Sequence, residues 1–344
     1  MSDGVTSPGV GGRGAVLYAG ETTVSKIPFS VSVYEHAAAL IGRSPWDVSR
    51  DEDLLWRAHR EAYLLYRHFP VVVGIDIYNL EAEAYGCHVE RPGGNGMPAI
   101  TRPLFRSLGE ALSVGQFGLQ RAGRIPMVIR AARRLAEAFP EADIRVPVSG
   151  PFSIATSLLG ADEMLMSAAD APDLARQFLL ALVPGQVRLC EAARAAGLDV
   201  AFFESAAAPP LLSPAQFSEV ELPALKAAMV QIGAAVGHSV PCIIGGDTEP
   251  IIEQILETGT DFVICPAETN REKFMRRVES HPEVKTRVNL DPRVYSRGTQ
   301  DEIIAAVDEV IALAAGRPNV LLGTGAVPYE TPPGNILLIR DYVA

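Results

Sequence analysis

The pattern of apolar and polar positions between Val240 and Pro266 predicts one strand, helix and strand unit. An apolar run from Pro241 to Ile244 meets a Gly-Gly-Asp turn, and Glu249 to Leu256 then has the spacing of a helix that buries one face. Gly259 ends this helix, and residues 262–265 are apolar again. Two buried strands joined by a helix predict a parallel pair, because parallel strands need a long crossover and are covered on both faces.

The same alternation of apolar runs and helical patterns extends along the chain. A helical pattern follows each of eight predicted strands, which are residues 27–33, 70–77, 144–150, 200–204, 241–244, 262–265, 284–290 and 319–323. Eight such units are the number that closes a single (β/α)8 TIM barrel. An open dinucleotide-binding sheet is the weaker alternative, because no strand pattern is accompanied by a G-x-G-x-x-G turn.

Two segments lack this alternation. Residues 1–20 are rich in glycine, serine and valine, and we interpret them as a flexible N-terminal lead-in without chemistry, which leaves 21–344 as one barrel domain. Residues 86–123 are irregular and contain the sequence GGNGMP, so they predict a long insertion after the second strand. Insertions of this length often form lids or subunit contacts, so a homodimer is left open.

Composition and charge narrow the class of protein. The chain has 344 residues, 48% hydrophobic and 21% charged, with a net charge of -11. This charge argues against nucleic acid and anionic membranes as partners, since both attract basic patches. No apolar run reaches about 18 residues and no signal-peptide layout is present, so we expect a cytoplasmic enzyme that acts on a small molecule. The four cysteines form no C-x-x-C pair, which argues against disulfides and a zinc knuckle.

In a (β/α)8 barrel the residues that follow the strands meet at one mouth, and function is sought there. The sequence places many polar side chains and few cations at these positions, so we expect an acidic mouth. The predicted mouth residues are Tyr34, Glu35, His36, Asp76, Tyr78, Asn79, Ser149, Phe152, Glu204, Ser205, Gly246, Asp247, Cys265, Glu268, Asn289, Asp291, Thr324 and Tyr329.

Six segments spread over most of the chain carry a family resemblance. They are GIDIYNLEAEAYG (74–86), VSGPFSIATSLLG (148–160), FFESAAAPPLLSPAQFSEVELP (202–223), GGDTEPIIEQILETGTDFV (245–263), VNLDP (288–292) and LLGTGAVPYETPPGN (321–335). In these segments the chain resembles the uroporphyrinogen decarboxylase superfamily, which also contains corrinoid and coenzyme M methyltransferases. The resemblance implies a single (β/α)8 barrel with its active cleft at the C-terminal mouth, although a fold alone does not fix an activity.

The decarboxylases of this superfamily provide the first comparison that the resemblance implies. They carry an arginine-rich motif after the first strand that holds the carboxylates of the substrate. This sequence has Glu35 and His36 at that place, and Arg43 follows only about two turns later. An acidic mouth would repel a tetrapyrrole with several carboxylates, so haem-pathway decarboxylation is not expected.

Other decarboxylase positions are matched only in part. The aspartate that binds pyrrole N–H groups matches Asp76, and the family serine matches Ser205. The tyrosine of the third-strand loop is replaced by Ser157, and the final histidine by Thr324. Asp76 therefore keeps recognition of a pyrrole-like group open.

The methyltransferases of the superfamily imply a zinc site made by an H-x-C-G motif and a later cysteine. The corresponding positions here are Ile243, Gly245 and Thr324, so this zinc site is not expected. The residues left for an alternative metal cluster are His238, Cys242, Cys265 and Glu268. We favour the interpretation that the two cysteines are small buried residues of the barrel.

The predicted catalytic residues are His36, Asp76 and Glu35. Glu35 and His36 stand on a loop after the first strand, and His36 is the best general base available there, although an ordinary hydrogen-bonded histidine is the simpler interpretation. Asp76 is either a helix cap or an acid and ligand-binding group. If it faces the mouth, replacing it should weaken binding with little change in the melting temperature.

The predicted substrate-binding residues also have simpler alternatives. Glu204 and Ser205 could equally well form hydrogen bonds with backbone groups at the end of a strand. Asn289 could start a turn, and Asp247 could cap a turn. The full predicted set is Tyr34, Tyr78, Asn79, Phe152, Glu204, Ser205, Asp247, Asn289, Thr324 and Tyr329.

Taken with the resemblance, these residues favour a methyltransferase-like enzyme that moves a methyl group between a small donor and a corrinoid or folate-type carrier. We expect no tightly bound cofactor and no zinc; the carrier would be cobalamin on a partner corrinoid protein, or tetrahydrofolate. The main alternative is a decarboxylase of a pyrrole-like or other small carboxylate. The second alternative is a non-catalytic subunit that binds a tetrapyrrole or a corrinoid protein.

Overall fold

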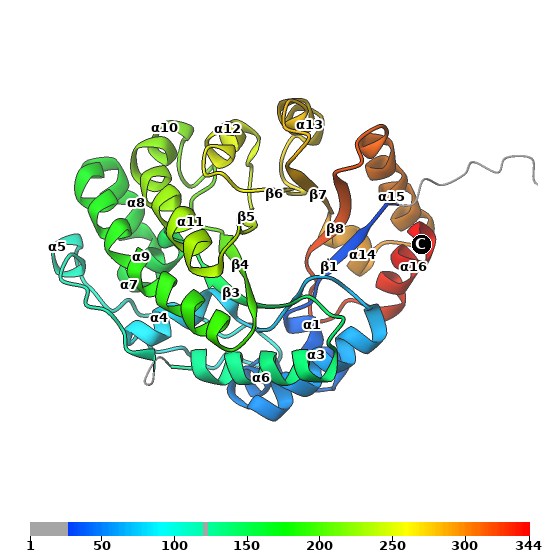
Figure 1. The fold of residues 1–344 in the computed structure, drawn as a ribbon, viewed down its shortest axis with the longest axis horizontal. Coiled ribbons are helices and arrows are strands. Elements are labelled where there is room, and N and C mark those ends of the chain that lie inside the picture. The colour runs from blue at the N-terminus through cyan, green and yellow to red at the C-terminus, as the bar shows by residue number, and fades with distance from the viewer. Residues whose placement is uncertain (1–26, 120–122) are drawn as a thin grey trace, which may run out of the picture.

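The computed structural model describes residues 27–119 and 123–344, which form two four-stranded parallel sheets covered by helices (Figure 1). The strand orders are β1-β8-β7-β6 and β2-β3-β4-β5. Each of the eight predicted strands is present: β1 Phe29–Ser32, β2 Val71–Val72, β3 Ile144–Ser149, β4 Asp199–Glu204, β5 Cys242–Ile244, β6 Phe262–Cys265, β7 Lys285–Leu290 and β8 Val320–Ala326. The predicted lead-in, residues 1–20, lies outside the described residues.

The two sheets stand around a common centre with the helices outside them, which is a TIM-barrel-like α/β arrangement (Figure 1). Backbone hydrogen bonds join the named strands in two groups of four, since no ladder among the described strands links β1 to β2 or β5 to β6. The fold class predicted from the sequence is therefore confirmed in this coarser form, and the closure into one continuous barrel stays a prediction.

Several helices begin where the sequence supplies a cap or a proline. Asp51 accepts a hydrogen bond from the backbone of Leu54 at the start of α3, and proline occupies the first turn of α7 and α10. The helices are α1 Glu35–Leu40, α2 Pro45–Arg50, α3 Glu52–Tyr66, α4 Leu80–Tyr85, α5 Leu108–Ala111, α6 Ile125–Ala138, α7 Pro151–Leu159, α8 Ala161–Asp170, α9 Pro172–Ala195, α10 Pro214–Gln216, α11 Leu222–Val236, α12 Ile252–Leu256, α13 Arg271–Val278, α14 Pro292–Arg297, α15 Gln300–Ala314 and α16 Pro333–Val343.

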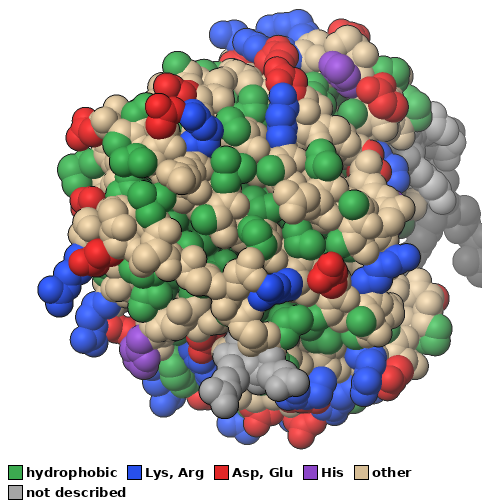
Figure 2. Space-filling view, turned by 60° about the vertical axis from the view of Figure 1, so that its left-hand side comes forward, with side chains coloured by type: hydrophobic (Ala, Val, Ile, Leu, Met, Phe, Trp, Pro, Cys, Tyr) green, Lys and Arg blue, Asp and Glu red, His purple; other side chains and the backbone are tan. Residues whose placement is uncertain are grey.

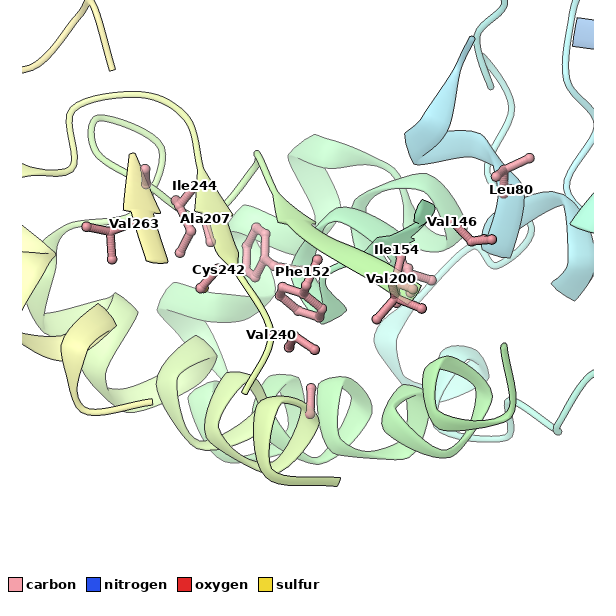
Figure 3. Close-up of a cluster of buried hydrophobic side chains, with 14 of the residues drawn as sticks. Leu80, Val146, Phe152, Ile154, Val200, Ala207, Val240, Cys242, Ile244 and Val263 are labelled. Atoms are coloured by element: carbon pink, nitrogen blue, oxygen red, sulfur yellow. The ribbon is translucent and has the colours of Figure 1, made fainter. Parts of the chain in front are cut away.

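The main core lies between the strands and the surrounding helices. Figure 3 shows part of it, where Phe152 and Ile154 of α7 lie close to Val200 of β4 and Cys242 of β5. Each of these side chains is at most 1% exposed. This packing removes the apolar faces of both layers from water, which is the main favourable contribution to folding.

The insertion after β2 is largely irregular, as the sequence predicts. In its described part, Glu90 and Ala99 form an isolated antiparallel bridge, and α5 is its one α-helix. The backbone N–H groups of Leu104 and Phe105 both donate to the carbonyl of Leu158, which ties the insertion to the end of α7. The insertion is thus fixed to the C-terminal end of α7 by backbone hydrogen bonds.

The surface is mixed in character. Figure 2 turns the side of α8 and α9 toward the viewer, and apolar side chains there lie scattered among other atoms, with charged side chains mainly around the margin. Met166 on α8 and Leu174 on α9 are among the exposed apolar residues. Within residues 27–119 and 123–344, no helix has the length and apolar character that crossing a membrane requires.

Candidate functional site

A cavity of about 540 Å³ opens at the carboxyl ends of the strands. Its walls come from residues in or just after β1, β2 and β4 to β8, so it lies at the mouth where the sequence indicates a site. An apolar wall is formed by Ile75, Ile77, Phe203, Ile243 and Ile264. Residues 97–100 of the insertion close another side, which gives the insertion a direct place in the site.

The structure brings about half of the predicted catalytic and binding residues together. Those that line the cavity are Tyr34, Glu35, Asp76, Tyr78, Asn79 and Asn289. Those that lie outside it are His36, Phe152, Glu204, Ser205, Asp247, Thr324 and Tyr329.

His36 lies behind the cavity wall. It is 1% exposed, and its Nε2 atom is 2.7 Å from the hydroxyl of Tyr66 on α3, whose ring stacks on the imidazole. Burial lowers the pKa of His36. The prediction that His36 acts as a base at the rim is corrected, because its side chain faces α3 and not the cavity.

Glu204 is a buried cap for helix α7. Its carboxylate accepts hydrogen bonds from the backbone N–H groups of Phe152 at 3.0 Å, Ser153 at 3.3 Å and Ser205 at 2.9 Å, and from the Ser153 hydroxyl. Burial raises the pKa of Glu204. Phe152 is part of the core in Figure 3, so these predicted ligand-binding residues instead hold α7 against β4.

Three more predicted residues make structural contacts. Thr324 is fully buried and accepts a hydrogen bond from the backbone of Ser32 at 3.1 Å. The Tyr329 hydroxyl donates to the carbonyl of Arg43 at 3.1 Å, and Asp247 accepts a hydrogen bond from a nearby threonine hydroxyl. Their substrate-binding assignment is corrected, because none of the three reaches the cavity.

Asp76 lines the cavity but is already paired. Its two oxygens lie 2.6 and 2.8 Å from the two terminal nitrogens of Arg124, and Asn79 donates to it at 2.9 Å. Arg124 also pairs with Glu83 at 2.6 Å. The side chains of Arg124 and Asp76 are 8% and 2% exposed, so this is a buried ion pair. Asp76 is therefore poorly suited to a free acid, base or pyrrole acceptor.

Glu35 is the acid best placed to act on a ligand. It stands at the start of α1 and lines the cavity, and burial raises the pKa of its carboxyl group. Tyr34 and Tyr78 both pack edge-to-face against Phe203, with ring centroids 6.2 and 6.4 Å from it. Burial raises the pKa of both tyrosines, so their hydroxyls stay protonated as hydrogen-bond donors.

Arg287 of β7 is a buried cation in the cavity that the sequence analysis missed. It is 4% exposed and donates to the Asn289 side-chain oxygen at 3.1 Å and to the Ser32 hydroxyl at 3.2 Å. No acidic side chain of the described residues lies within salt-bridge distance of its guanidinium. Burial lowers the pKa of Arg287, since desolvation opposes the charged form. The mouth is thus less uniformly acidic than expected.

The residues present do not fit a zinc ion. Of the positions that the resemblance assigns to zinc ligands, Ile243 is apolar, Gly245 has no side chain and Thr324 is committed to a backbone hydrogen bond. In the alternative cluster, burial raises the pKa of Cys242 and Cys265, which opposes the thiolate form. Throughout the described ranges, no group of three or more His, Cys, Asp or Glu side chains is arranged to hold a metal.

The comparisons with known proteins agree with the resemblance. The family described as Uroporphyrinogen decarboxylase (URO-D) matches residues 16–344. The chain belongs to the uroporphyrinogen decarboxylase family. No curated protein matches this sequence.

Among solved structures, this family member is similar to a "methyltransferase from Methanosarcina mazei". The two share 20% sequence identity with a TM-score of 0.78, and the match covers 92% of this chain and 94% of the other. This likeness concerns the fold alone. A structure of KGPDC from Streptococcus mutans matches at 15% identity and a TM-score of 0.30, over 62% of this chain and 92% of the other, which is too weak to carry an argument.

Proposed function

We propose that this chain is a methyltransferase that moves a methyl group between a small donor in the cavity and a corrinoid or folate-type carrier at the mouth. The support from relatives is membership of the uroporphyrinogen decarboxylase family and a fold shared with a methyltransferase. The observation that carries the proposal is the placement of Glu35, a carboxyl group with a raised pKa, in a cavity with an apolar wall.

The apolar wall suits the group that is transferred. A methyl group makes no hydrogen bonds, so it is held by contact with side chains such as Ile75, Ile243 and Ile264. The polar part of the donor would then face the tyrosines, Glu35 and Arg287. This division of the cavity would orient the donor with its methyl carbon exposed to the carrier.

Glu35 would supply the proton that the reaction requires. When the bond between the methyl carbon and a donor oxygen or nitrogen breaks, the electron pair stays on that atom, while the carrier forms the new bond to carbon. The Glu35 carboxyl group donates its proton to the departing atom and is later reprotonated by water. A raised pKa keeps more of this carboxyl in the protonated form near neutral pH.

The carrier would supply the nucleophile that takes the methyl group. Since the residues do not fit zinc, an acceptor thiol activated by zinc is not part of this proposal. We expect cobalamin on a partner corrinoid protein, or tetrahydrofolate, as the carrier, and the enzyme is expected to act in the cytoplasm.

Decarboxylation of a small carboxylate is the second candidate. The buried Arg287 favours it, because a guanidinium suits a carboxylate. Asp76 gives no support to decarboxylation of a pyrrole-like substrate, because Arg124 donates hydrogen bonds to both of its carboxylate oxygens. Decarboxylation would release carbon dioxide, which methyl transfer does not.

The experiment follows single-turnover demethylation of methyl ethers and methylamines with free cob(I)alamin as acceptor. Glu35→Gln should reduce the rate by roughly 10²- to 10⁴-fold, because glutamine cannot give up a proton. Glu137→Gln, an exposed acid on α6, is the control that should leave the rate unchanged. The wild-type rate should be high at low pH and fall as the pH rises through the raised pKa of Glu35. A full rate in Glu35→Gln contradicts the proposal.

A further inference from the structure

We infer that the ligand of the cavity is a small monocarboxylate whose carboxylate group binds Arg287. This inference rests on the proposed function in one respect, which is that the bound ligand is the methyl donor. The donor would then be a carboxylate that carries a methyl group on oxygen or nitrogen. The binding itself follows from the burial, the partners and the surroundings of the guanidinium.

Within residues 27–119 and 123–344, Arg287 has no acidic counter-ion of the kind that a buried arginine normally has. Another arginine with similar burial, Arg124, is paired with Asp76 and Glu83. Arg145 on β3 is paired with Asp143 at 2.9 Å. In contrast, the hydrogen-bond partners of Arg287 within the described chain are all neutral. Because an unpaired buried charge is costly, Arg287 is expected to gain its counter-ion from a ligand.

The neutral partners hold the guanidinium in one orientation. Its Nε atom donates to Asn289 at 3.1 Å, and its Nη1 atom contacts the hydroxyls of Ser32 at 3.2 Å and Ser30 at 3.5 Å. Its Nη2 atom has no hydrogen-bond partner in the part of the chain that is described. Gly323 on β8 makes room for the stem, since an added Cβ there would lie 2.5 Å from the Arg287 side chain.

The cavity around Arg287 suits one negative charge and not two. Glu268 lines the same cavity, and its carboxylate would repel a dianion such as phosphate more strongly than a monoanion. A planar carboxylate matches the guanidinium fork, and the protonated Tyr34 hydroxyl is a further donor. The apolar wall with Phe203 then takes the body of the molecule.

The test is calorimetric titration of the full-length wild-type protein with benzoate, phenylacetate and acetate, each compared with its neutral amide and with inorganic phosphate. We expect at least one carboxylate to bind about tenfold or more tightly than its amide. Equal binding of each acid and its amide, no binding by all three acids at about 10 mM, or tighter binding by phosphate would each overturn the inference.

Variants at Arg287 test whether this residue causes the tighter binding of an acid than of its amide. Arg287→Met should abolish this preference. The variant should still fold, because the substitution removes a buried charge that has no acidic partner among the described residues. Arg287→Lys keeps the charge without the planar fork and should bind with intermediate affinity. Arg145→Met, near the N-terminal start of β3 and outside the cavity lining, is the matched control and should keep the preference. Retention of the preference in Arg287→Met, or its loss in Arg145→Met alone, would overturn the assignment.

The outcome separates this inference from the proposed function. Binding of carboxylates through Arg287 without methyl transfer to any carrier would retain the inference and reject the proposed function. Methyl transfer from neutral donors alone, unaffected by Arg287→Met, would retain the proposed function and reject the inference.

Discussion

Replacing Arg124 with methionine should destabilise the protein, because Arg124 holds the buried carboxylate of Asp76. The two side chains are 8% and 2% exposed, and they are joined by contacts of 2.6 and 2.8 Å. Removing the guanidinium leaves a carboxylate out of water without its cation. The structure therefore changes the sequence-based expectation that Asp76 can be replaced with little change in the melting temperature.

The magnitude follows from what remains after the substitution. Breaking a buried ion pair by removing one partner costs about 3–5 kcal/mol. Asn79 still donates to Asp76 at 2.9 Å, and Glu83 keeps its contact with Arg50, so we expect the low end, about 3 kcal/mol. With an unfolding entropy of about 2 cal/mol/K per residue, a chain of this length should lose about 4 °C in melting temperature.

The assay is urea unfolding combined with thermal unfolding, for Arg124→Met, Asp76→Asn and the double variant. The double variant should be more stable than the sum of the single losses indicates, because the two residues interact directly. Arg130→Met, on the helix α6 that begins directly after Arg124, is the control. Arg130 pairs with Glu52 at the surface and should cost at most about 1 kcal/mol. If Arg124→Met loses no more stability than Arg130→Met, the reasoning is refuted.

Two further predictions concern buried carboxylates. Burial raises the pKa of Glu81 to about 7 from an ordinary 4.5. The folded state thus binds this proton more tightly than the unfolded state, and the free energy of unfolding should fall by about 3 kcal/mol as the pH rises from about 4.5 to about 7. Glu81→Gln should remove that part of the slope in urea unfolding, and an unchanged slope would count against it. Gly150→Ala should lower the free energy of unfolding by roughly 1–3 kcal/mol, because the added Cβ would clash with the Glu204 carboxylate. Gly245→Ala is the control and should be nearly neutral, because no atom lies within 4 Å of the added Cβ. Equal losses of stability in the two variants would contradict this prediction.

Much of the fold could be predicted because buried strands have a strong local signal. The apolar runs placed all eight strands, and the helical spacing of apolar residues placed the long helices. The boundaries depended on tertiary contacts that the sequence does not display. β2 ends at Val72 because the chain past Gly74 turns into the short 3-10 helix Ile77–Asn79. β8 extends to Ala326 because it pairs with Ser32 of β1.

The site was less predictable, because side-chain direction and distant pairing decide it. Glu35 and His36 were treated as one unit, yet successive helical residues point about 100° apart, so one faces the cavity and the other faces α3. Arg287 was included in an apolar run, and its orientation into the cavity could not be deduced from that run. Arg124 lies 48 residues from Asp76, so a pattern search could not pair them.

The central claim is methyl transfer in the cavity, and isotope tracing tests it most directly. Methoxy- and methylamino-carboxylates, labelled separately in the methyl and carboxyl groups, are incubated with the wild-type protein, cob(I)alamin and tetrahydrofolate. The account predicts that the methyl label of at least one donor appears on one of the two carriers, while the carboxyl label stays in the demethylated product. Release of the carboxyl label as carbon dioxide, with the methyl label unmoved, would contradict it.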